Sequence, residues 1–311
     1  MSVNQSSQPE PPRQTPPYRG RFAPSPTGPL HFGSLVAAVA SYLEAKTSNG
    51  SWLVRMEDID PPREVPGAAD NILRALERHG LYWDESVVFQ SQRHEAYQAA
   101  VDDLRQRRLI YPCSCSRKDI LRQLADSELS VYPGTCRNGL VKPSSQHAIR
   151  VLTVSEEYGF EDQILGYFGH NVGEVVGDFV LQRADGWFAY QLAVVIDDAE
   201  QGITDVVRGS DLLDNTPRQI YLQQLFSVAQ PNYAHLPIAA NKSGEKLSKQ
   251  TMAQPVDDTT PTANLLNTLS FLGQNPPAEL ATDSLNDVWR WALEHWDLDK
   301  IPRVDKIMLD L

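Results

Sequence analysis

Cysteine and positive charge are both scarce in this chain. Its 311 residues include three cysteines, and 28 Lys and Arg stand against 40 Asp and Glu, which gives a formal net charge of −12. Three cysteines do not make a disulfide framework, and Cys113 and Cys115 are too close in sequence to bridge easily, which favours a reducing compartment. The acidic balance is untypical of proteins that hold nucleic acid through bulk charge, so any nucleic-acid contact is expected to be local.

A long apolar run is missing as well. The longest aliphatic stretch, near Leu35 to Leu43, is about half of the ~20 residues that span a bilayer. Residues 1–17 have no apolar segment typical of a signal peptide, and their five prolines, with no large aliphatic side chain after Val3, predict a disordered tail. We therefore expect a soluble, cytoplasmic protein with no membrane partner.

The first hundred residues after this tail alternate between strand-like and helix-like patterns. Arg19 to Ala23 can form a strand, Pro24 to Pro29 is rich in turn-forming residues, and apolar residues then recur at helical spacing from Leu35 to Leu43. Ser51 to Met56 predicts a second strand, and two helical patterns follow it. The alternation predicts an α/β fold with a Rossmann-like parallel sheet, the type that binds nucleotides.

The pattern breaks after residue 111 and resumes near residue 187. Cysteines, glycines and short β-like runs such as Ile149 to Val154 predict a small α+β insertion there. Trp187 to Ile196 is almost wholly apolar and predicts a buried strand, followed by a helix from about Thr216 to Val228 and a helical end with Leu285, Val288, Trp289, Ala292 and Trp296 on one face. The predicted units are a tail (1–17), a first sheet half (18–111), an inserted subdomain (112–186), a second half (187–250) and a helical segment (251–311).

The densest motif is Arg21-Phe-Ala-Pro-Ser-Pro-Thr-Gly28-Pro-Leu-His31-Phe-Gly33-Ser34. It places His31 at or near a helix N-terminus, where free N–H groups and the helix dipole favour an anion. Gly33 lets a bulky ligand approach the first turn because it has no Cβ. The alternative is a proline-rich loop with an ordinary, hydrogen-bonded histidine.

A second motif lies more than 200 residues later, Asn241-Lys-Ser-Gly-Glu-Lys246-Leu-Ser248-Lys249-Gln250. Ammonium groups and a hydroxyl in one loop suit a triphosphate and the charge that grows on departing pyrophosphate. Taken alone, such a loop is usually only solvated.

The cysteines form a third motif. Cys113 and Cys115, with Cys136 after a Pro-Gly turn, offer three of the four ligands of a zinc site. Spacing leaves the fourth ligand open between Tyr132, an uncommon ligand, and His147. Three buried thiols without metal are the alternative.

The first two motifs together resemble the His-Ile-Gly-His and Lys-Met-Ser-Lys-Ser signatures of class I aminoacyl-tRNA synthetases, with Ser34 and Gln250 as departures. The stretch that begins at Arg21 is more similar to the glutamyl than to the glutaminyl enzymes. The resemblance covers roughly residues 18 to 255, and the ~60 residues after it are too few for a large anticodon-binding region. Together with the cysteines, this resembles the glutamyl-Q tRNA(Asp) synthetase family.

That resemblance implies an ATP-dependent ligase that activates L-glutamate to glutamyl-adenylate. It would transfer the glutamyl group to queuosine in the anticodon of tRNA(Asp), without charging the tRNA 3′ end, and work as a monomer. The inserted subdomain would bind the acceptor. The alternatives are a short glutamyl-tRNA synthetase that acylates tRNA(Glu), and an inactive, RNA-binding paralogue.

The resemblance also assigns roles to residues. His31, Lys246 and Lys249 would be catalytic, and His31, Gly33, Ser248 and Lys249 would bind ATP with Mg²⁺. The glutamate site would consist of Arg21, Phe22, Ala23, Pro24, Ser25, Glu57, Tyr190 and Arg208.

The chemistry of these residue types suits glutamate. Arginine forks match carboxylates, so Arg21 and Arg208 would bind them, while Glu57 would pair with the ammonium and Tyr190 would add a hydroxyl. We take Asp58, Asp60, Asp197 and Asp198 as structural or loop acids.

The resemblance further selects Tyr132 as the fourth metal ligand beside Cys113, Cys115 and Cys136. One structural zinc per chain is expected, because four protein ligands leave no open position for a substrate.

Overall fold

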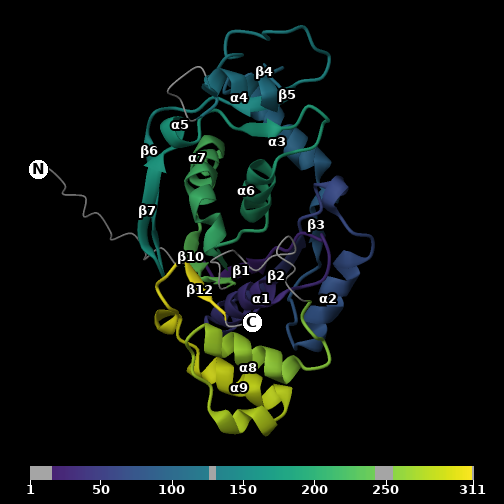
Figure 1. The fold of residues 1–311 in the computed structure, drawn as a ribbon, viewed down its shortest axis with the longest axis vertical. Helices are drawn as coiled ribbons and strands as arrows, with labels where there is room; N and C mark the ends of the chain where they lie inside the picture. The colour runs from purple at the N-terminus through teal and green to yellow at the C-terminus, as the bar shows by residue number, and fades with distance from the viewer. Residues whose placement is uncertain (1–15, 126–130, 242–254, 310–311) are drawn as a thin grey trace, which may run out of the picture.

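The computed structural model describes residues 16–125, 131–241 and 255–309, and a central sheet with helices on both sides organises it (Figure 1). The first half is a parallel sheet in the order β1-β2-β3, formed by β1 (Arg19–Phe22), β2 (Ser51–Met56) and β3 (Val88–Phe89). Helix α1 (Phe32–Thr47) connects β1 to β2, and α2 (Ala68–Arg78) lies between β2 and β3. The predicted strand, loop and helix at the start of the chain are confirmed, as is the strand at 51–56.

The second half is a four-stranded sheet in the order β7-β6-β10-β9. Its strands are β6 (Glu157–Asp162), β7 (Gly166–Asn171), β9 (Asp205–Gly209) and β10 (Asn232–Leu236). Strand β10 is parallel to β9 and β6, and α7 (Thr216–Phe226) connects β9 to β10. Strand β9 lies beside β1, where the N–H of Thr204 donates to the carbonyl of Arg19 at 3.0 Å. The two halves therefore meet between β1 and β9, the kind of switch point at which α/β sheets bind ligands.

Alternate residues of these strands enter different hydrophobic cores. Trp52 and Val54 of β2 pack with α1 and α9 (Leu285–His295), whereas Leu53 packs with α6 (Tyr190–Glu200) and α7. Helix α8 (Pro261–Phe271) joins α9 beyond α1, at the bottom of Figure 1. Alternation along a strand puts successive side chains on opposite faces, so α1 covers one face of the sheet while α6 and α7 cover the other.

The segment predicted as an insertion contains a separate antiparallel sheet, β4-β5-β8. It is formed by β4 (Ile110–Cys113), β5 (Ala148–Val151) and β8 (Val180–Gln182). The neighbouring helices are α3 (His94–Gln106), α4 (Arg117–Ala125) and the short α5 (Val172–Val175). The β6–β7 hairpin from the same segment joins the second half instead, through the pairing of Asp162 with Tyr233. The predicted boundaries at 112 and 186 stay a prediction, and this hairpin crosses from the segment into the main sheet.

The predicted strand at 187–196 is wrong, because α6 begins at Tyr190 and continues to Glu200. Seven residues of α6 are buried, including Gln191, Asp197 and Asp198, so the helix is enclosed on nearly all sides and its sequence shows no clear amphipathic period. A short apolar run of this kind cannot be told from a buried strand by periodicity.

The helical end of the chain is confirmed for α8 and α9, and a last strand, β12 (Lys306–Met308), pairs in parallel with β11 (Ile238–Ala240). Trp296 lies one residue beyond α9, as its C-cap. The predicted tail lies outside the described residues except for Pro16 and Pro17, which have no regular secondary structure. Within 16–125, 131–241 and 255–309, no helix has both the length and the apolar character needed to cross a bilayer.

Candidate functional site

A cavity of about 590 Å³ opens at the carboxyl ends of β1 and β9. It lies where the two sheet halves meet, and its wall comes from the loop after β1, the start of α1, the end of β2, and the segment from β9 to β11. All the predicted glutamate residues line it, as do two predicted ATP residues: Arg21, Phe22, Ala23, Pro24, Ser25, Glu57, Tyr190, Arg208, His31 and Gly33. The structure thus brings together residues that are up to 187 positions apart (208 − 21).

The predicted residues Lys246, Ser248 and Lys249 lie outside the described residues, as does Gln250. The chain on either side of them is described. Ile238 and Ala239 line the cavity, and Pro255 forms a β-bridge with His31, next to which the N–H of Val256 donates to the carbonyl of Leu30 at 2.9 Å. Both flanks of the second motif therefore border the wall that the first motif forms.

His31 is the N-cap of α1. Its Nδ1 accepts from the backbone N–H of Ser34 at 3.2 Å, and the Ser34 hydroxyl lies 3.1 Å from Nε2. The imidazole is thereby folded onto the first helical turn, and a Cβ on Gly33 would come within 3.4 Å of its ring. Ser34, a departure from the signature, consequently supports the histidine directly.

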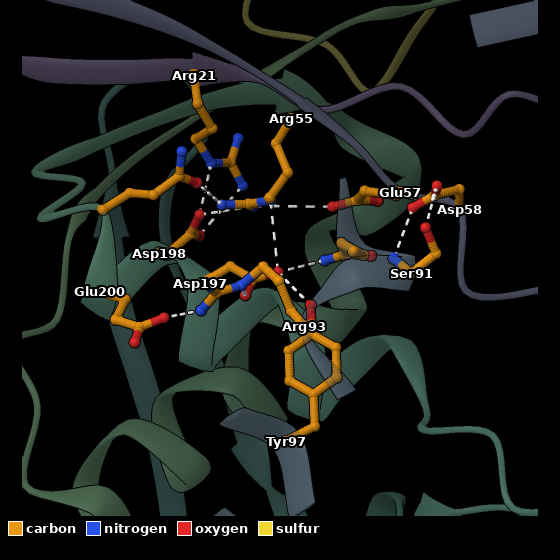
Figure 2. Close-up of polar contacts among 12 residues, drawn as sticks. Arg21, Arg55, Glu57, Asp58, Ser91, Arg93, Tyr97, Asp197, Asp198 and Glu200 are labelled. Carbon is orange, nitrogen blue, oxygen red and sulfur yellow. Dashed lines mark hydrogen bonds and ion pairs between the residues drawn. The ribbon is translucent and has the colours of Figure 1, made fainter. Parts of the chain in front are cut away.

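Arg21 and Arg55 share one buried carboxylate (Figure 2). Arg21 donates to Asp198 through Nε at 3.0 Å and Nη2 at 3.3 Å, and Arg55 Nη2 donates to the same carboxylate at 2.7 Å. Burial would raise the pKa of Asp198, but the two guanidinium groups hold it below its ordinary value. The neighbouring Asp197 accepts from Gln90, Arg93 and Tyr97. Both aspartates, which we took as structural, are buried structural acids that fix the first half against α6.

The Arg208 guanidinium uses two of its three nitrogens in hydrogen bonds within the described part of the protein. Its Nε donates to His235 Nε2 at 3.1 Å and its Nη2 donates to Thr216 Oγ1 at 2.7 Å. Its Nη1 is buried and has no hydrogen-bond partner among the described residues. A buried donor without a partner is costly, so this arm is suited to a carboxylate that enters the cavity.

Glu57 follows β2 and is held over the cavity by its backbone N–H, which donates to Pro24 at 3.0 Å. Its Oε1 lies 3.8 Å from Arg55 Nη2, beyond a hydrogen bond. Burial raises the pKa of Glu57 to about 7, with Asp198 and Asp197 adding to the rise and Arg55 and Arg21 opposing it. A carboxyl group with such a raised pKa is stabilised in its ionised form by a ligand that brings a positive charge.

Glutamate binding is therefore expected to strengthen as the pH rises from about 6 to about 8. At a pH below its pKa of about 7, Glu57 is neutral and cannot pair with an ammonium. At a higher pH the Glu57 carboxylate can form this pair, because the amine of the substrate stays protonated. The measurement is the glutamate KM as a function of pH. Glu57→Gln should make the KM independent of pH. Asp58→Asn is the control and should keep the pH dependence of the parent, because the Asp58 side chain binds Ser91. A parent KM that does not change with pH would contradict this role.

The three cysteines meet in the β4-β5-β8 region, away from the cavity. The Sγ atoms of Cys113, Cys115 and Cys136 lie within 4.8 Å of one another, and the Tyr132 hydroxyl is 3.3 Å from Cys113 Sγ. Four ligands at ordinary zinc distances are separated by about 3.5 to 4 Å, so this donor set fits a zinc ion. Burial opposes ionisation of Cys136, but backbone N–H groups of Val141 and Ser114 lower its pKa to about 6.

The Tyr132 hydroxyl lies close to two of the thiols, 3.3 Å from Cys113 Sγ and 3.7 Å from Cys115 Sγ. The Tyr132 oxygen accepts from the backbone N–H of Cys136 at 2.9 Å, and Arg150 stacks on its ring with 4.0 Å from the guanidinium carbon to the ring centre. Among the described His, Cys, Asp and Glu side chains, the three cysteines form a group close enough to hold a metal, and His147 does not belong to this group. Burial and the neighbouring thiols raise the pKa of the Tyr132 phenol, and the N–H of Cys136 opposes that rise, so a phenolate here would depend on the charge of a bound metal.

Sequence reasoning missed the residues that hold the site together. Arg55 and Asp198 brace Arg21, and Thr216, His235 and Asp162 brace Arg208. The only sequence signal was a polar residue inside an apolar run, as with His235 in Tyr233-Ala-His-Leu236. Such a residue needs a buried partner, but the run does not say which.

Comparison with known proteins agrees with this geometry. The family described as tRNA synthetases class I (E and Q), catalytic domain, matches residues 18–281. A glutamyl-Q tRNA(Asp) synthetase of Dechloromonas aromatica is 55% identical over 296 residues, which cover 94% of this chain and 98% of that protein. One of Pseudomonas aeruginosa is 52% identical over 287 residues, 92% of this chain and 96% of that protein.

Solved structures of glutamate-tRNA ligases have the same fold. The chain superposes on the enzyme of Elizabethkingia meningosepticum, crystallised with its amino acid, with a TM-score of 0.76 and 27% identity, over 93% of this chain and 66% of that one. The enzyme of Elizabethkingia anophelis gives a TM-score of 0.77 and 26% identity, over 94% and 68%. This chain thus spans about two thirds of those ligases.

The fold and the cavity therefore define a class I tRNA synthetase catalytic domain of the E and Q type. Within that class, the chain belongs to the family whose members are named glutamyl-Q tRNA(Asp) synthetase.

Proposed function

We propose that this protein activates L-glutamate with ATP and transfers the glutamyl group to queuosine in the anticodon of tRNA(Asp). The observation that carries the proposal is the convergence of Arg21, Arg208, Glu57 and Tyr190 with His31 on one cavity. The site offers two guanidinium groups, one carboxylate and one phenol, the complement of an amino acid with two carboxylates. The names of relatives that match nearly the whole chain support queuosine as the acceptor.

In the first step an oxygen of the glutamate α-carboxylate attacks the α-phosphorus of ATP. A new P–O bond forms, the bond to the β,γ-diphosphate breaks, and pyrophosphate leaves with the electron pair. The protein supplies no nucleophile, so positioning and electrostatics carry the rate. His31 and the N-terminal turn of α1 favour the phosphates, and Gly33 leaves room for them.

Mg²⁺ bound with ATP would offset negative charge on the phosphates during this step. Lys246, Ser248 and Lys249 supply the remaining contacts to the triphosphate in our proposal. In support, Pro255 after this motif pairs with His31, and Ile238 and Ala239 before it line the cavity.

In the second step a hydroxyl of queuosine attacks the carbonyl carbon of glutamyl-adenylate. The ester bond forms, the C–O bond to the phosphate breaks, AMP leaves, and the hydroxyl proton passes to solvent. We assign acceptor binding to residues 112–186 and a structural role to one zinc held by Cys113, Cys115, Cys136 and Tyr132. None of these four residues lines the cavity.

Lys249→Ala is expected to lower the rate of adenylate formation by about 10- to 100-fold, because one charge-assisted contact to the leaving pyrophosphate is lost. The glutamate KM should change far less. Pyrophosphate exchange over a range of glutamate concentrations measures both the rate and the KM, with Lys242→Ala in the same motif as the matched control. Equal exchange rates in variant and parent would remove Lys249 from the mechanism.

The function is tested by labelling with radioactive glutamate. The purified protein should first catalyse glutamate-dependent exchange of pyrophosphate into ATP without tRNA, and then label queuosine-containing tRNA(Asp) but not tRNA(Asp) that lacks queuosine. Labelling of tRNA(Glu) instead would favour the short glutamyl-tRNA synthetase, which the names of the relatives do not support. Absence of exchange would favour the inactive paralogue.

A further inference from the structure

The guanidinium of Arg208 is bound by a chain of buried hydrogen bonds that runs through residues outside the cavity lining. Arg208 Nε donates to His235 Nε2 at 3.1 Å, and His235 Nδ1 lies 2.6 Å from Asp162 Oδ2. His235 is 0% exposed and Asp162 is 4% exposed, so water cannot replace either partner. Neither residue lines the cavity, and the chain reaches it only through Arg208.

The direction of these hydrogen bonds fixes the form of the histidine. A guanidinium group only donates, so His235 Nε2 must accept, and the neutral ring then carries its proton on Nδ1 and donates it to Asp162. Burial lowers the pKa of His235 to about 4, with Asp162 opposing and Arg208 reinforcing the shift. The opposite tautomer would turn an N–H toward the N–H of Arg208 and break the hydrogen bond.

Asp162 is itself held by the backbone. It accepts from the N–H groups of Ile164 at 3.0 Å and Leu165 at 2.9 Å, and from the N–H of His235 at 3.1 Å. Asp162 ends β6, whose pairing with β10 places it beside His235. Strand pairing thus sets the position of the carboxylate, and the carboxylate sets the tautomer.

The consequence appears at the cavity. With Nε bound to His235 and Nη2 bound to Thr216, Nη1 of Arg208 has no partner among the residues that the structure describes and is the nitrogen left for a ligand. We infer that His235 and Asp162 are positioning residues that orient Arg208 toward a substrate carboxylate and thereby help the site to select glutamate over its uncharged analogues. The inference rests on the proposed function, because it takes glutamate as the ligand of Arg208.

The experiment compares four variants of the full chain with the parent: Asp162→Asn, His235→Leu, His235→Gln and Glu161→Gln. Gln at 235 offers an oxygen to Arg208 and an amide to Asp162, whereas Leu offers neither. Glu161 is the exposed neighbour of Asp162 on β6 and serves as the matched control. The readouts are glutamate affinity by calorimetry, kcat and the KM values for glutamate and ATP in pyrophosphate exchange, and thermal melting.

His235→Leu and Asp162→Asn are expected to raise the glutamate Kd and KM by about 10- to 100-fold, with kcat and the ATP KM within about threefold of the parent. His235→Gln should recover most of the affinity, and Glu161→Gln should match the parent. Asp162→Asn preserves side-chain volume, so it carries the test if His235→Leu no longer melts cooperatively.

Two results overturn the inference alone: Asp162→Asn with an unchanged glutamate Kd while the parent binds glutamate, or a His235→Gln variant as impaired as His235→Leu. A parallel fall in kcat and in both affinities would mean a purely structural role and would also overturn it. A parent protein that neither binds glutamate nor catalyses exchange overturns the proposed function, and the inference with it.

Discussion

Arg208→Ala is expected to raise the glutamate KM by about 100- to 1,000-fold while the ATP KM stays within a few-fold of the parent. The variant loses Nη1, a buried donor that has no partner among the described residues, and it leaves a substrate carboxylate in the cavity without its counter-charge. It also removes the donors that satisfy His235 Nε2 and Thr216 Oγ1. The expected loss, about 3 to 4 kcal/mol, comes from these combined effects.

Steady-state pyrophosphate exchange over a range of glutamate concentrations measures this effect. Arg208→Lys should fall between the parent and Arg208→Ala, because an ammonium keeps the charge but lacks the fork that contacts His235, Thr216 and the ligand together. Arg303→Ala, at an exposed position, is the arginine control. A glutamate KM in Arg208→Ala close to that of the parent would refute the role of Arg208.

Cys136→Ser is expected to abolish zinc binding and to destabilise the β4-β5-β8 region. Cys136 is fully buried in the cysteine cluster, where its backbone N–H donates to the Tyr132 oxygen and its Sγ lies 3.6 Å from Cys115 Sγ. Because a structural metal contributes its binding energy to folding, we expect a loss of roughly 4 kcal/mol and a Tm lower by roughly 10 °C. Glutamate-dependent pyrophosphate exchange should persist, since the cluster does not line the cavity.

Metal analysis together with thermal melting tests this expectation. The parent and Ser114→Ala, a substitution between two of the cysteines, should each contain about one zinc per chain, and Cys136→Ser should contain none. A parent purified under metal-replete conditions without zinc would identify the cluster as three packed thiols. Loss of exchange at a temperature where Cys136→Ser remains folded would contradict the separation of the two sites.

The cavity wall could be predicted from sequence because its residues lie in dense local motifs. The stretch from Arg21 to Ser34 carries the turn residues, the helix N-cap and the first arginine within fourteen positions (34 − 21 + 1), so a resemblance over that stretch locates one whole wall. Strand β2 could also be predicted, since it is a short, mostly apolar run that follows a turn. Strand β1, Arg-Gly-Arg-Phe, is not apolar, and the turn-forming residues after it mark its end. Local signals of this kind survive without tertiary context.

The features that the sequence did not predict correctly depend on tertiary packing and on contacts between distant segments. Helix α6 was predicted as a strand because burial on nearly every side removes its helical period. The acid that braces Arg21 is Asp198, 177 positions away, and the histidine that braces Arg208 depends on Asp162, 73 positions away. No spacing rule links such pairs, because sheet topology alone brings them together.

The central claim is that glutamate and ATP bind in the one cavity between β1 and β9. A crystal structure with a non-hydrolysable glutamyl-adenylate analogue tests this most directly. Our account places the free carboxylate of the analogue within hydrogen-bond distance of Arg208 or Arg21, its ammonium against Glu57 and its adenosine beside His31 and Gly33. An analogue bound elsewhere, with these residues unchanged and without contact to it, would contradict the account.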